Sequence, residues 1–203
     1  MTSFTGTAES GAEVIYTDHK RHMYWLILIS PLVSFSSIWL YFVLDKNPIV
    51  TLIPALFFYI FTPIMDVLMG EDPHNPPEEV VSAMSADRYY RVTVHSLVFV
   101  AIALFVSFVV FVGTQDLPWW AILALIIGVG SNSGGVMTMT HELGHKANKA
   151  DRLTAKIGNM IMGYGHFNIE HNKGHHTWVA TPEDPASSRM GETFYSFMFR
   201  ELS

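Results

Sequence analysis

Four long apolar runs, separated by polar stretches, dominate the first 139 positions of the chain. The runs cover residues 23–44, 49–69, 92–112 and 118–139. Each is close to the ~20 residues that a helix needs to cross the hydrocarbon core of a membrane. The pattern therefore predicts four transmembrane helices.

The polar stretches between the runs predict how these helices connect. Residues 45–48 separate the first two runs and residues 113–117 the last two, so the helices should form two tight hairpins. The link between the hairpins, residues 70–91, is longer and begins with prolines and acidic residues. Its second part, residues 78–91, is expected to form a helix on the surface.

The fold class predicted from this pattern is all-α, with three parts along the chain. Residues 1–22 should form a polar amino-terminal segment, residues 23–139 the transmembrane region, and residues 140–203 a helical region with histidine motifs. Within the last region, the apolar stretches 157–169 and 194–199 are too short to span a membrane, so we expect them to be buried or interfacial.

Lysine and arginine predict the orientation in the membrane. They gather before the first and third runs and after the fourth, at Lys20, Arg21, Arg88, Arg91, Lys146, Lys149, Arg152 and Lys156. The two short loops contain only Lys46. Because positive loops remain in the cytoplasm, the amino terminus, the 70–91 link and the histidine motifs should all lie on the cytoplasmic side of the inner membrane.

Composition narrows the possible chemistry. The 203 residues include no cysteine, so any metal ligand must be His, Asp, Glu or backbone oxygen. The net charge of −6 argues against nucleic acid as a partner. The first apolar run is too long for the core of a signal peptide and is followed by no small-residue cleavage site, so we expect it to be retained.

Two histidine clusters follow the fourth run. His-Glu-Leu-Gly-His occupies 141–145, and Glu-His-Asn-Lys-Gly-His-His occupies 170–176. In an α-helix, residues four apart share a face, which groups His141 with His145 and His171 with His175, with His176 one step around. Imidazole favours Zn, Cu, Fe and Ni. Five such ligands exceed one tetrahedral zinc site, which indicates two metals or one unusually rich site.

Neighbouring residues can support such a site. Glu142 and Glu170 each adjoin a candidate ligand, and carboxylates commonly orient metal-bound imidazoles. His166 is a weaker candidate for the same supporting role. The sequence does not single out a catalytic residue.

The fourth run also carries a glycine-rich stretch at 128–135. Close helix packing explains such a stretch, and so does a groove for a slender substrate, to which Gly130 and Gly134 would contribute. In the second run, Phe57, Phe58 and Phe61 are candidate walls of a substrate channel. For any one of these aromatics, a lipid-facing or core position is the simpler interpretation.

The first cluster also matches the His-Glu-x-x-His pattern of zinc proteases, in which Glu142 would act as the general base. Such a site needs only one further ligand, so the second cluster disfavours an intramembrane protease. A metal transporter is a third interpretation, but His95 alone lies within an apolar run.

The histidine clusters and the short motifs around them resemble those of a known family. His-Glu-Leu-Gly-His-Lys at 141–146 and the second cluster at 170–176 resemble the first two histidine boxes of membrane-bound alkane 1-monooxygenases. Ala-Thr-Pro-Glu-Asp-Pro-Ala-Ser-Ser-Arg at 180–189 is similar to the same family, as are Gly-Glu-Asp at 70–72 and Asn-Pro-Pro at 75–77.

This resemblance implies two non-haem irons held by histidine, in a membrane domain of six helices. It implies hydroxylation of the terminal methyl of medium-chain alkanes by O₂, with electrons from rubredoxin and an NADH-linked reductase. Related enzymes that hydroxylate aromatic methyl groups carry similar boxes. The family's third histidine box is absent from this chain, which resembles the amino-terminal half of such an enzyme, and this part alone is expected to be inactive.

The resemblance also gives a role to the basic residues near the histidines. Rubredoxins are acidic, so a patch of five cations could dock the electron donor: Lys146, Lys149, Arg152, Lys156 and Lys173. The topology signal described above accounts for most of them equally well.

Overall fold

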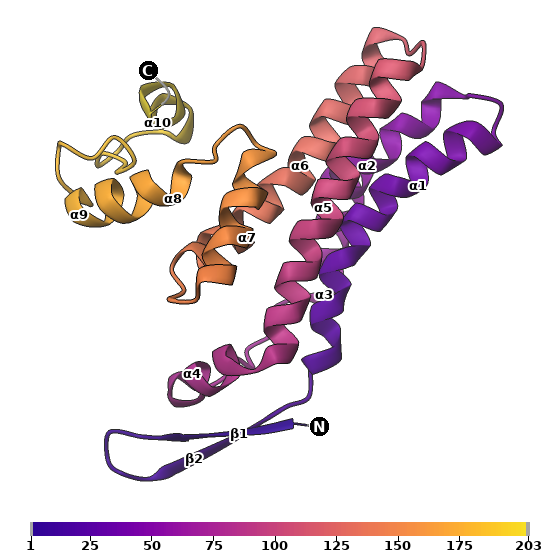
Figure 1. Cartoon of the computed structure of the whole chain (residues 1–203). Coiled ribbons are helices and arrows are strands. Elements are labelled where there is room, and N and C mark those ends of the chain that lie inside the picture. The colour runs from indigo at the N-terminus through magenta and orange to yellow at the C-terminus, as the bar shows by residue number, and fades with distance from the viewer. Residues whose placement is uncertain (1, 202–203) are drawn as a thin grey trace. The chain divides into compact units, whose positions relative to one another are not determined.

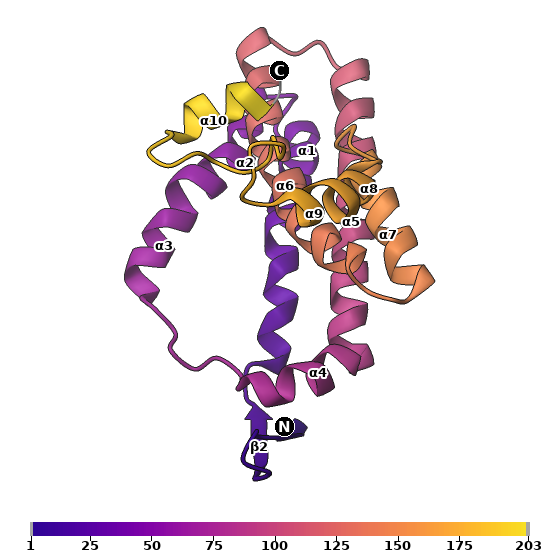
Figure 2. The same ribbon diagram turned by 90° about the vertical axis from the view of Figure 1, so that its left-hand side faces the viewer.

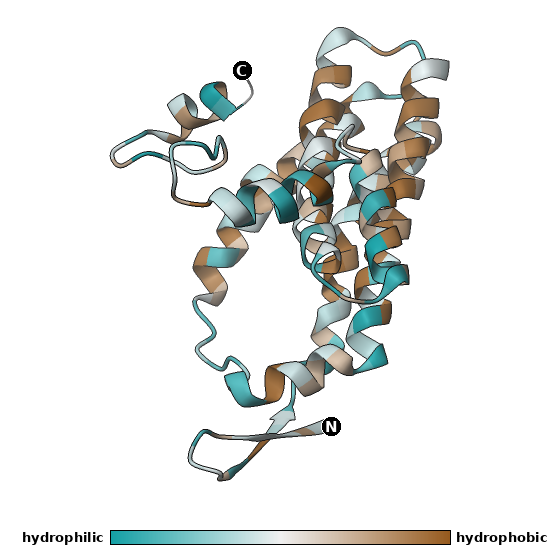
Figure 3. Cartoon of the chain, turned by 60° about the vertical axis from the view of Figure 1, so that its left-hand side comes forward, coloured by the Kyte–Doolittle hydropathy of each residue, from teal (hydrophilic) through white to brown (hydrophobic). Residues whose placement is uncertain are grey.

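The computed structural model describes residues 2–201 and is mainly helical (Figure 1). Within this range, four helices are long and apolar enough to cross a membrane: Arg21–Val43, Pro48–Met69, Arg88–Thr114 and Trp119–Gly144. Figure 3 shows apolar residues concentrated along these helices. The predicted four spans are confirmed, and the chain is a multi-pass membrane protein by this criterion.

The chain divides into two compact units, one ending at Met139 and the other beginning at Thr140. The first unit opens with strands β1 (Thr2–Thr7) and β2 (Glu13–Asp18). The first span combines the 3-10 helix η1 (Arg21–Leu28) with α1 (Ile29–Val43). The second combines η2 (Pro48–Leu52), α2 (Ile53–Leu56), η3 (Phe57–Phe61) and α3 (Thr62–Met69). The remaining helices are α4 (Glu78–Ala86), α5 (Arg88–Thr114) and α6 (Trp119–Gly144), which continues past the boundary.

The β-hairpin at the amino terminus is an element that the all-α prediction lacked. Its strands pair antiparallel, with Phe4 opposite Tyr16. Phe4 packs in a small core with Val80 and Met84 of α4. The hairpin therefore has one apolar face, and α4 covers it.

The second span is not one straight helix. Pro63 has no N–H with which to continue the helical bonding, and the preceding turn, η3, widens to a π-helix. The hydroxyl of Thr62 donates to the carbonyl of Phe57 at 2.8 Å, which compensates part of the disrupted bonding. Beyond this turn α3 diverges from α1 and α5, and its side chains are exposed except for the half-buried Met65 (Figure 2).

The core of the first unit lies where α1, α5 and α6 pack together. Its buried apolar residues are Tyr41, Val50, Leu104, Phe108, Phe111, Leu117, Ala121, Leu125 and Val129. A buried polar link crosses the same helices, since the Asn132 amide donates to the Ser34 hydroxyl at 2.7 Å. Side-chain hydrogen bonds between membrane helices contribute about 0.6–2 kcal/mol each.

The glycines of α6 serve different purposes. A Cβ on Gly128 would lie 2.4 Å from Pro54 Cβ and 2.7 Å from the backbone nitrogen of Ala55. Close packing with the second span therefore explains this glycine. A Cβ on Gly130 or Gly134 would meet nothing within 4 Å, so packing does not explain these two.

We expect Gly128→Ala to lower the unfolding temperature in detergent, because backbone and proline atoms cannot yield to the new methyl group. Gly130→Ala is the matched control. It should be neutral or stabilising by up to about 1 kcal/mol, because alanine is the better helix former. Equal unfolding temperatures for the two variants would contradict the packing of α6 against the second span.

The second unit begins with the last turn of α6, and its described part, up to residue 201, contains four further helical segments. These are α7 (Lys149–Met160), α8 with the continuous π-helix η4 (Phe167–Glu170 and His171–His175), α9 (His176–Trp178) and α10 (Phe194–Glu201). The Asn148 side chain caps α7 by accepting from the backbone N–H of Ala150 at 2.8 Å. The Thr140 hydroxyl pairs with the buried Asn159 at 2.5 Å and joins the end of α6 to α7.

Candidate metal centre

The first histidine cluster lies at the carboxyl end of α6. His141 and His145 are one helical turn apart, and their rings lie 4.7 Å from centroid to centroid. Their Nε2 atoms are 3.3 Å apart. The two rings lie on the same side of the helix end, as expected for residues four apart in an α-helix.

The second cluster does not follow α-helical spacing. Residues His171–His175 form the π-helix η4, whose wider turn brings residues five apart closer to one face than an α-helix does. The Nε2 atoms of His171 and His176 consequently lie 3.1 Å apart. His175 stacks on His171 instead, with centroids 5.3 Å apart and planes at 18°. The predicted pairing of His171 with His175 is present as ring stacking, and the wider turn brings His176 to His171 as well.

The two clusters meet within the second unit. His141 Nε2 lies 2.7 Å from His171 Nε2, so a series of short contacts joins His145, His141, His171 and His176. A Cβ on Gly144 would lie 2.6 Å from Oδ1 of Asn168. Glycine in the first motif thus permits the close approach of α8, which leads into the second motif.

These nitrogens fit a transition-metal ion. The nitrogens of His141, His145 and His171 all lie within 4.8 Å of one another. Two adjacent ligands about 2.1 Å from one metal are separated by roughly 3 Å, which is the range of the contacts observed. Nitrogen ligands alone suit Fe, Zn, Cu or Ni and not Mg or Ca.

The imidazoles at the centre of this group are held in the neutral form that binds metals. Burial, followed by repulsion from His141 and His176, lowers the pKa of His171 to about 4. The same influences lower the pKa of His145. At neutral pH both rings are therefore mainly in the neutral form, which keeps a lone pair on one nitrogen for a metal.

The carboxylates and His166, expected to support the site, occupy two different environments. Oε1 of Glu142 lies 2.9 Å from Nδ1 of His141, on the side of the ring opposite its clustered nitrogen. Glu170 accepts a hydrogen bond from the Tyr164 hydroxyl at 2.7 Å and lies 3.2 Å from Nε2 of His166. The bond to Glu170, followed by burial, raises the pKa of Tyr164 to about 12.

Asp184 is a site residue that sequence reasoning did not single out. Its Oδ2 lies 2.8 Å from Nδ1 of His175, and its side chain is only 2% exposed. It also accepts from the hydroxyl of Ser187 at 2.6 Å and from the backbone N–H of Ala186 at 3.1 Å. The Ser187 hydrogen bond is the largest cause that lowers the pKa of Asp184, and His175 adds to it. The Asp-Pro-Ala-Ser turn at 184–187 is the only signal of this role in the sequence.

Two of the predicted channel residues, Phe58 and Gly130, line cavities in the first unit. Phe58 lines a cavity of about 210 Å³ together with Ala101, Asn132 and Gly135. Gly130 lines a separate cavity of about 500 Å³ between α5 and α6. Phe57 stacks on Phe61 with ring centroids 5.4 Å apart, Phe61 is half exposed, and neither is among the residues that line these cavities. Gly134 is likewise outside both cavities.

A third cavity, of about 520 Å³, lies in the second unit beside the histidines. Gly144 and Asn172 line it, and each adjoins a clustered histidine in the chain. Its cationic side chains are Lys149, Arg152, Lys156 and Lys173. The cavity therefore offers concentrated positive charge within the same unit as the imidazoles.

Comparison with known proteins agrees with this geometry. The fatty acid desaturase family matches residues 117–203, the stretch that contains both histidine clusters. The chain is a homologue of the alkane 1-monooxygenases, which confirms the resemblance seen in its motifs.

The similarity to individual relatives extends over most of the chain. It is 42% identical to the alkane 1-monooxygenase of Pseudomonas putida, over 92% of this chain and 46% of that protein. The enzyme of Ectopseudomonas oleovorans is 43% identical, and alkane 1-monooxygenase 1 of Alcanivorax borkumensis is 41% identical, each over the same shares. The chain spans about half the length of these curated relatives.

The low pKa of His171 predicts a pH-dependent stability of the metal-free protein. Between the ordinary imidazole pKa of about 6.5 and the folded value of about 4, the unfolded chain binds a proton that the folded chain does not. The free energy of unfolding should therefore fall as the pH is lowered through this window.

Thermal unfolding in the presence of a chelator, from pH 7.5 to 4.5, would test this. His171→Gln should weaken the pH dependence, whereas His166→Gln, which alters an exposed histidine of the same unit, should change it less. Identical pH profiles for wild type and His171→Gln would contradict the low pKa.

Proposed function

We propose that this chain forms the membrane region and the first part of the metal centre of an enzyme that hydroxylates the terminal methyl group of medium-chain alkanes with O₂. One observation carries the proposal. The imidazole nitrogens of two sequence-distant motifs converge, with His141 and His171 only 2.7 Å apart, in the stretch that matches the fatty acid desaturase family. The homology to alkane 1-monooxygenases supplies the reaction class.

The proposed cofactor is a pair of non-haem irons ligated by histidine. The grouped nitrogens of His141, His145, His171 and His176 would hold one iron. His175, whose Nδ1 faces Asp184, would contribute Nε2 to the other. When bound, iron supplies the redox chemistry that activates O₂.

A substrate without polar groups must be positioned by shape alone. We assign this role to the cavity of about 210 Å³, which is lined by residues of the transmembrane helices of the first unit. Phe58 lines it, as do Thr138 and Met139, which precede His141 in the same helix. Of the predicted channel residues, Phe58 has the most direct support, while Phe57, Phe61, Gly130 and Gly134 stay predictions.

Hydroxylation requires an electron donor, because one oxygen atom enters the alkane and the other leaves as water. The balance is RH + O₂ + 2H⁺ + 2e⁻ → ROH + H₂O. We propose an acidic rubredoxin, reduced by an NADH-linked reductase, as the source of these electrons. The cationic cavity beside the histidines is its proposed docking surface, which requires the cavity to face the cytoplasm, as the Lys and Arg distribution predicts for the inner membrane.

The alternative, an intramembrane zinc protease, is disfavoured by the position of Glu142. A general base must face the metal-bound water. Here the carboxylate lies beside Nδ1 of His141, whereas the clustered atom of that ring is Nε2.

The reaction is tested with the whole enzyme of which this chain is proposed to form the first part, reconstituted in lipid with rubredoxin, its reductase and NADH. Octane should yield 1-octanol, and the purified protein should contain iron. His141→Ala should abolish turnover, whereas His166→Ala should retain most of it. If the enzyme hydroxylates xylene but forms no octanol from octane, it belongs to the branch that acts on aromatic methyl groups. If it contains zinc without iron and cleaves peptides, the protease is favoured.

Docking is tested by the double charge reversal of Lys149 and Arg152 to glutamate. We expect slower reduction by rubredoxin at low ionic strength and a smaller difference at high salt, because screening weakens steering between exposed charges. Lys46→Glu, in the short loop after the first span, is the control. Equal rates for all three proteins would remove the docking role.

A further inference from the structure

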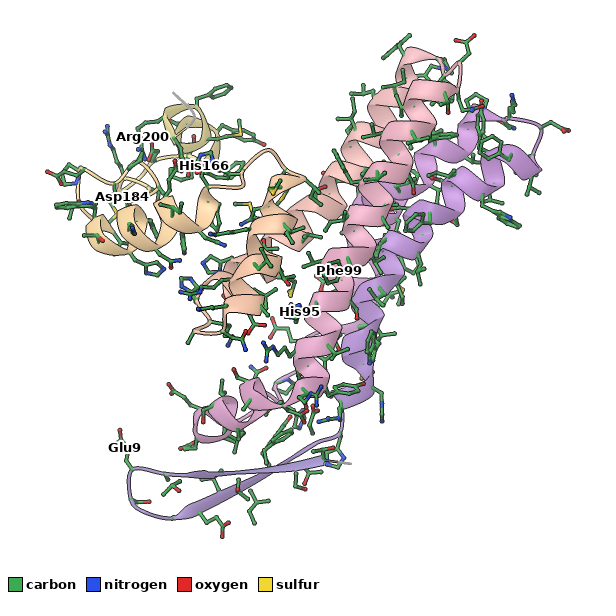
Figure 4. The ribbon with its side chains drawn as sticks, viewed as in Figure 1. Glu9, His95, Phe99, His166, Asp184 and Arg200 are labelled. Atoms are coloured by element: carbon green, nitrogen blue, oxygen red, sulfur yellow. The ribbon has the colours of Figure 1, made fainter. Side chains whose placement is uncertain are left out.

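Asp184, in the loop between α9 and α10 (Figure 4), links this loop to the second histidine cluster. This carboxylate is almost completely buried and faces Nδ1 of His175 at 2.8 Å. A carboxylate accepts hydrogen bonds, so His175 donates from Nδ1, and its lone pair is then on Nε2. The contact therefore selects the tautomer that can bind a metal through Nε2.

Asp184 is held in this position by its own turn. It accepts from the Ser187 hydroxyl and from the Ala186 backbone N–H. Ser187 also accepts from the backbone N–H of Ala180, which closes the loop on itself. A buried carboxylate is costly unless its oxygens are bonded, so these contacts fix its direction as well as its charge.

Arg200, on α10, clamps the same turn from outside. Its Nη1 donates to the Pro185 carbonyl at 3.0 Å, and its Nη2 donates to the Ser187 carbonyl at 2.9 Å. Its guanidinium also forms a two-bond pair with Glu192, with both distances 2.9 Å. Both clamped carbonyls belong to the turn that begins at Asp184. Arginine suits this role because its fork of donors is rigid.

We propose that Asp184 is a positioning residue that orients His175 for metal ligation, and that Arg200 acts by holding the Asp184 turn. The proposal rests on the metal centre of the proposed function. It adds a brace formed by residues 180–200, outside both histidine motifs. Stacking against His171 alone limits only the tilt of the His175 ring, whereas the carboxylate also determines which nitrogen is presented.

The test measures cobalt(II) binding by the purified full protein, through its visible absorption spectrum and a competing chelator. Asp184→Ala should weaken binding about 10- to 100-fold, the usual effect of losing a partner of a ligating histidine. The cobalt spectrum at saturation should change, because His175 is no longer held in one orientation. Asp184→Asn, which keeps the size and one acceptor oxygen, should fall between alanine and wild type.

Glu183→Ala is the matched control, since it removes an exposed carboxylate from the adjacent position. It should leave affinity and spectrum unchanged. If Asp184→Ala and Asp184→Asn bind cobalt as wild type does, the positioning role is overturned. If wild type binds neither iron nor cobalt, the proposed metal centre itself fails, and this result is distinguishable from the first.

The role of Arg200 is tested by a double-mutant cycle. Arg200→Gln should weaken cobalt binding in the wild-type background and have no further effect in Asp184→Ala, because both changes act through one turn. Additive losses would show that Arg200 acts by general stabilisation and would overturn its part of the proposal. Unfolding temperatures of all variants, measured without metal, separate loss of folding from loss of affinity.

Discussion

Two imidazole nitrogens can face each other at less than 3 Å only if at most one of them carries a proton. The contact between His141 and His171 imposes this constraint on the second unit, and the neighbouring contacts extend it to His145 and His176. Burial and repulsion from neighbouring rings lower the pKa of His171 and of His145, which favours the neutral form of these two rings. The close approach of α6 and α8 at Gly144 and the wide turn of η4 bring these nitrogens together, and Asp184 faces the adjacent His175.

The sequence was sufficient to predict the four spans, because length and apolar content alone determine whether a helix can cross a membrane. It also singled out the five histidines by their clustering, and the structure joins four of them by short contacts, while their ligation of a metal stays a prediction. The amino-terminal hairpin was missed for a physical reason. Its few apolar residues, such as Phe4, have meaning only when α4 is available to cover them.

Finer features of the site depended on information that local spacing does not contain. The grouping of His171 with His176 requires knowing that the helix widens, and the role of Asp184 requires knowing that a loop folds back nine residues later. Likewise, the glycines of α6 look alike in the sequence. Only the position of Pro54 distinguishes Gly128, which must be small, from Gly130, which lies in open space.

The π-helical turn at His171–His175 has a consequence for how such motifs are compared. The number of residues between two histidines determines the distance between their rings only when the number of residues per helical turn is known. On a regular α-helix, the same sequence His-x-x-x-His-His would point the imidazole of the last histidine away from that of the first. Anyone who transfers this motif to another protein must therefore transfer the π-helical turn together with the histidines.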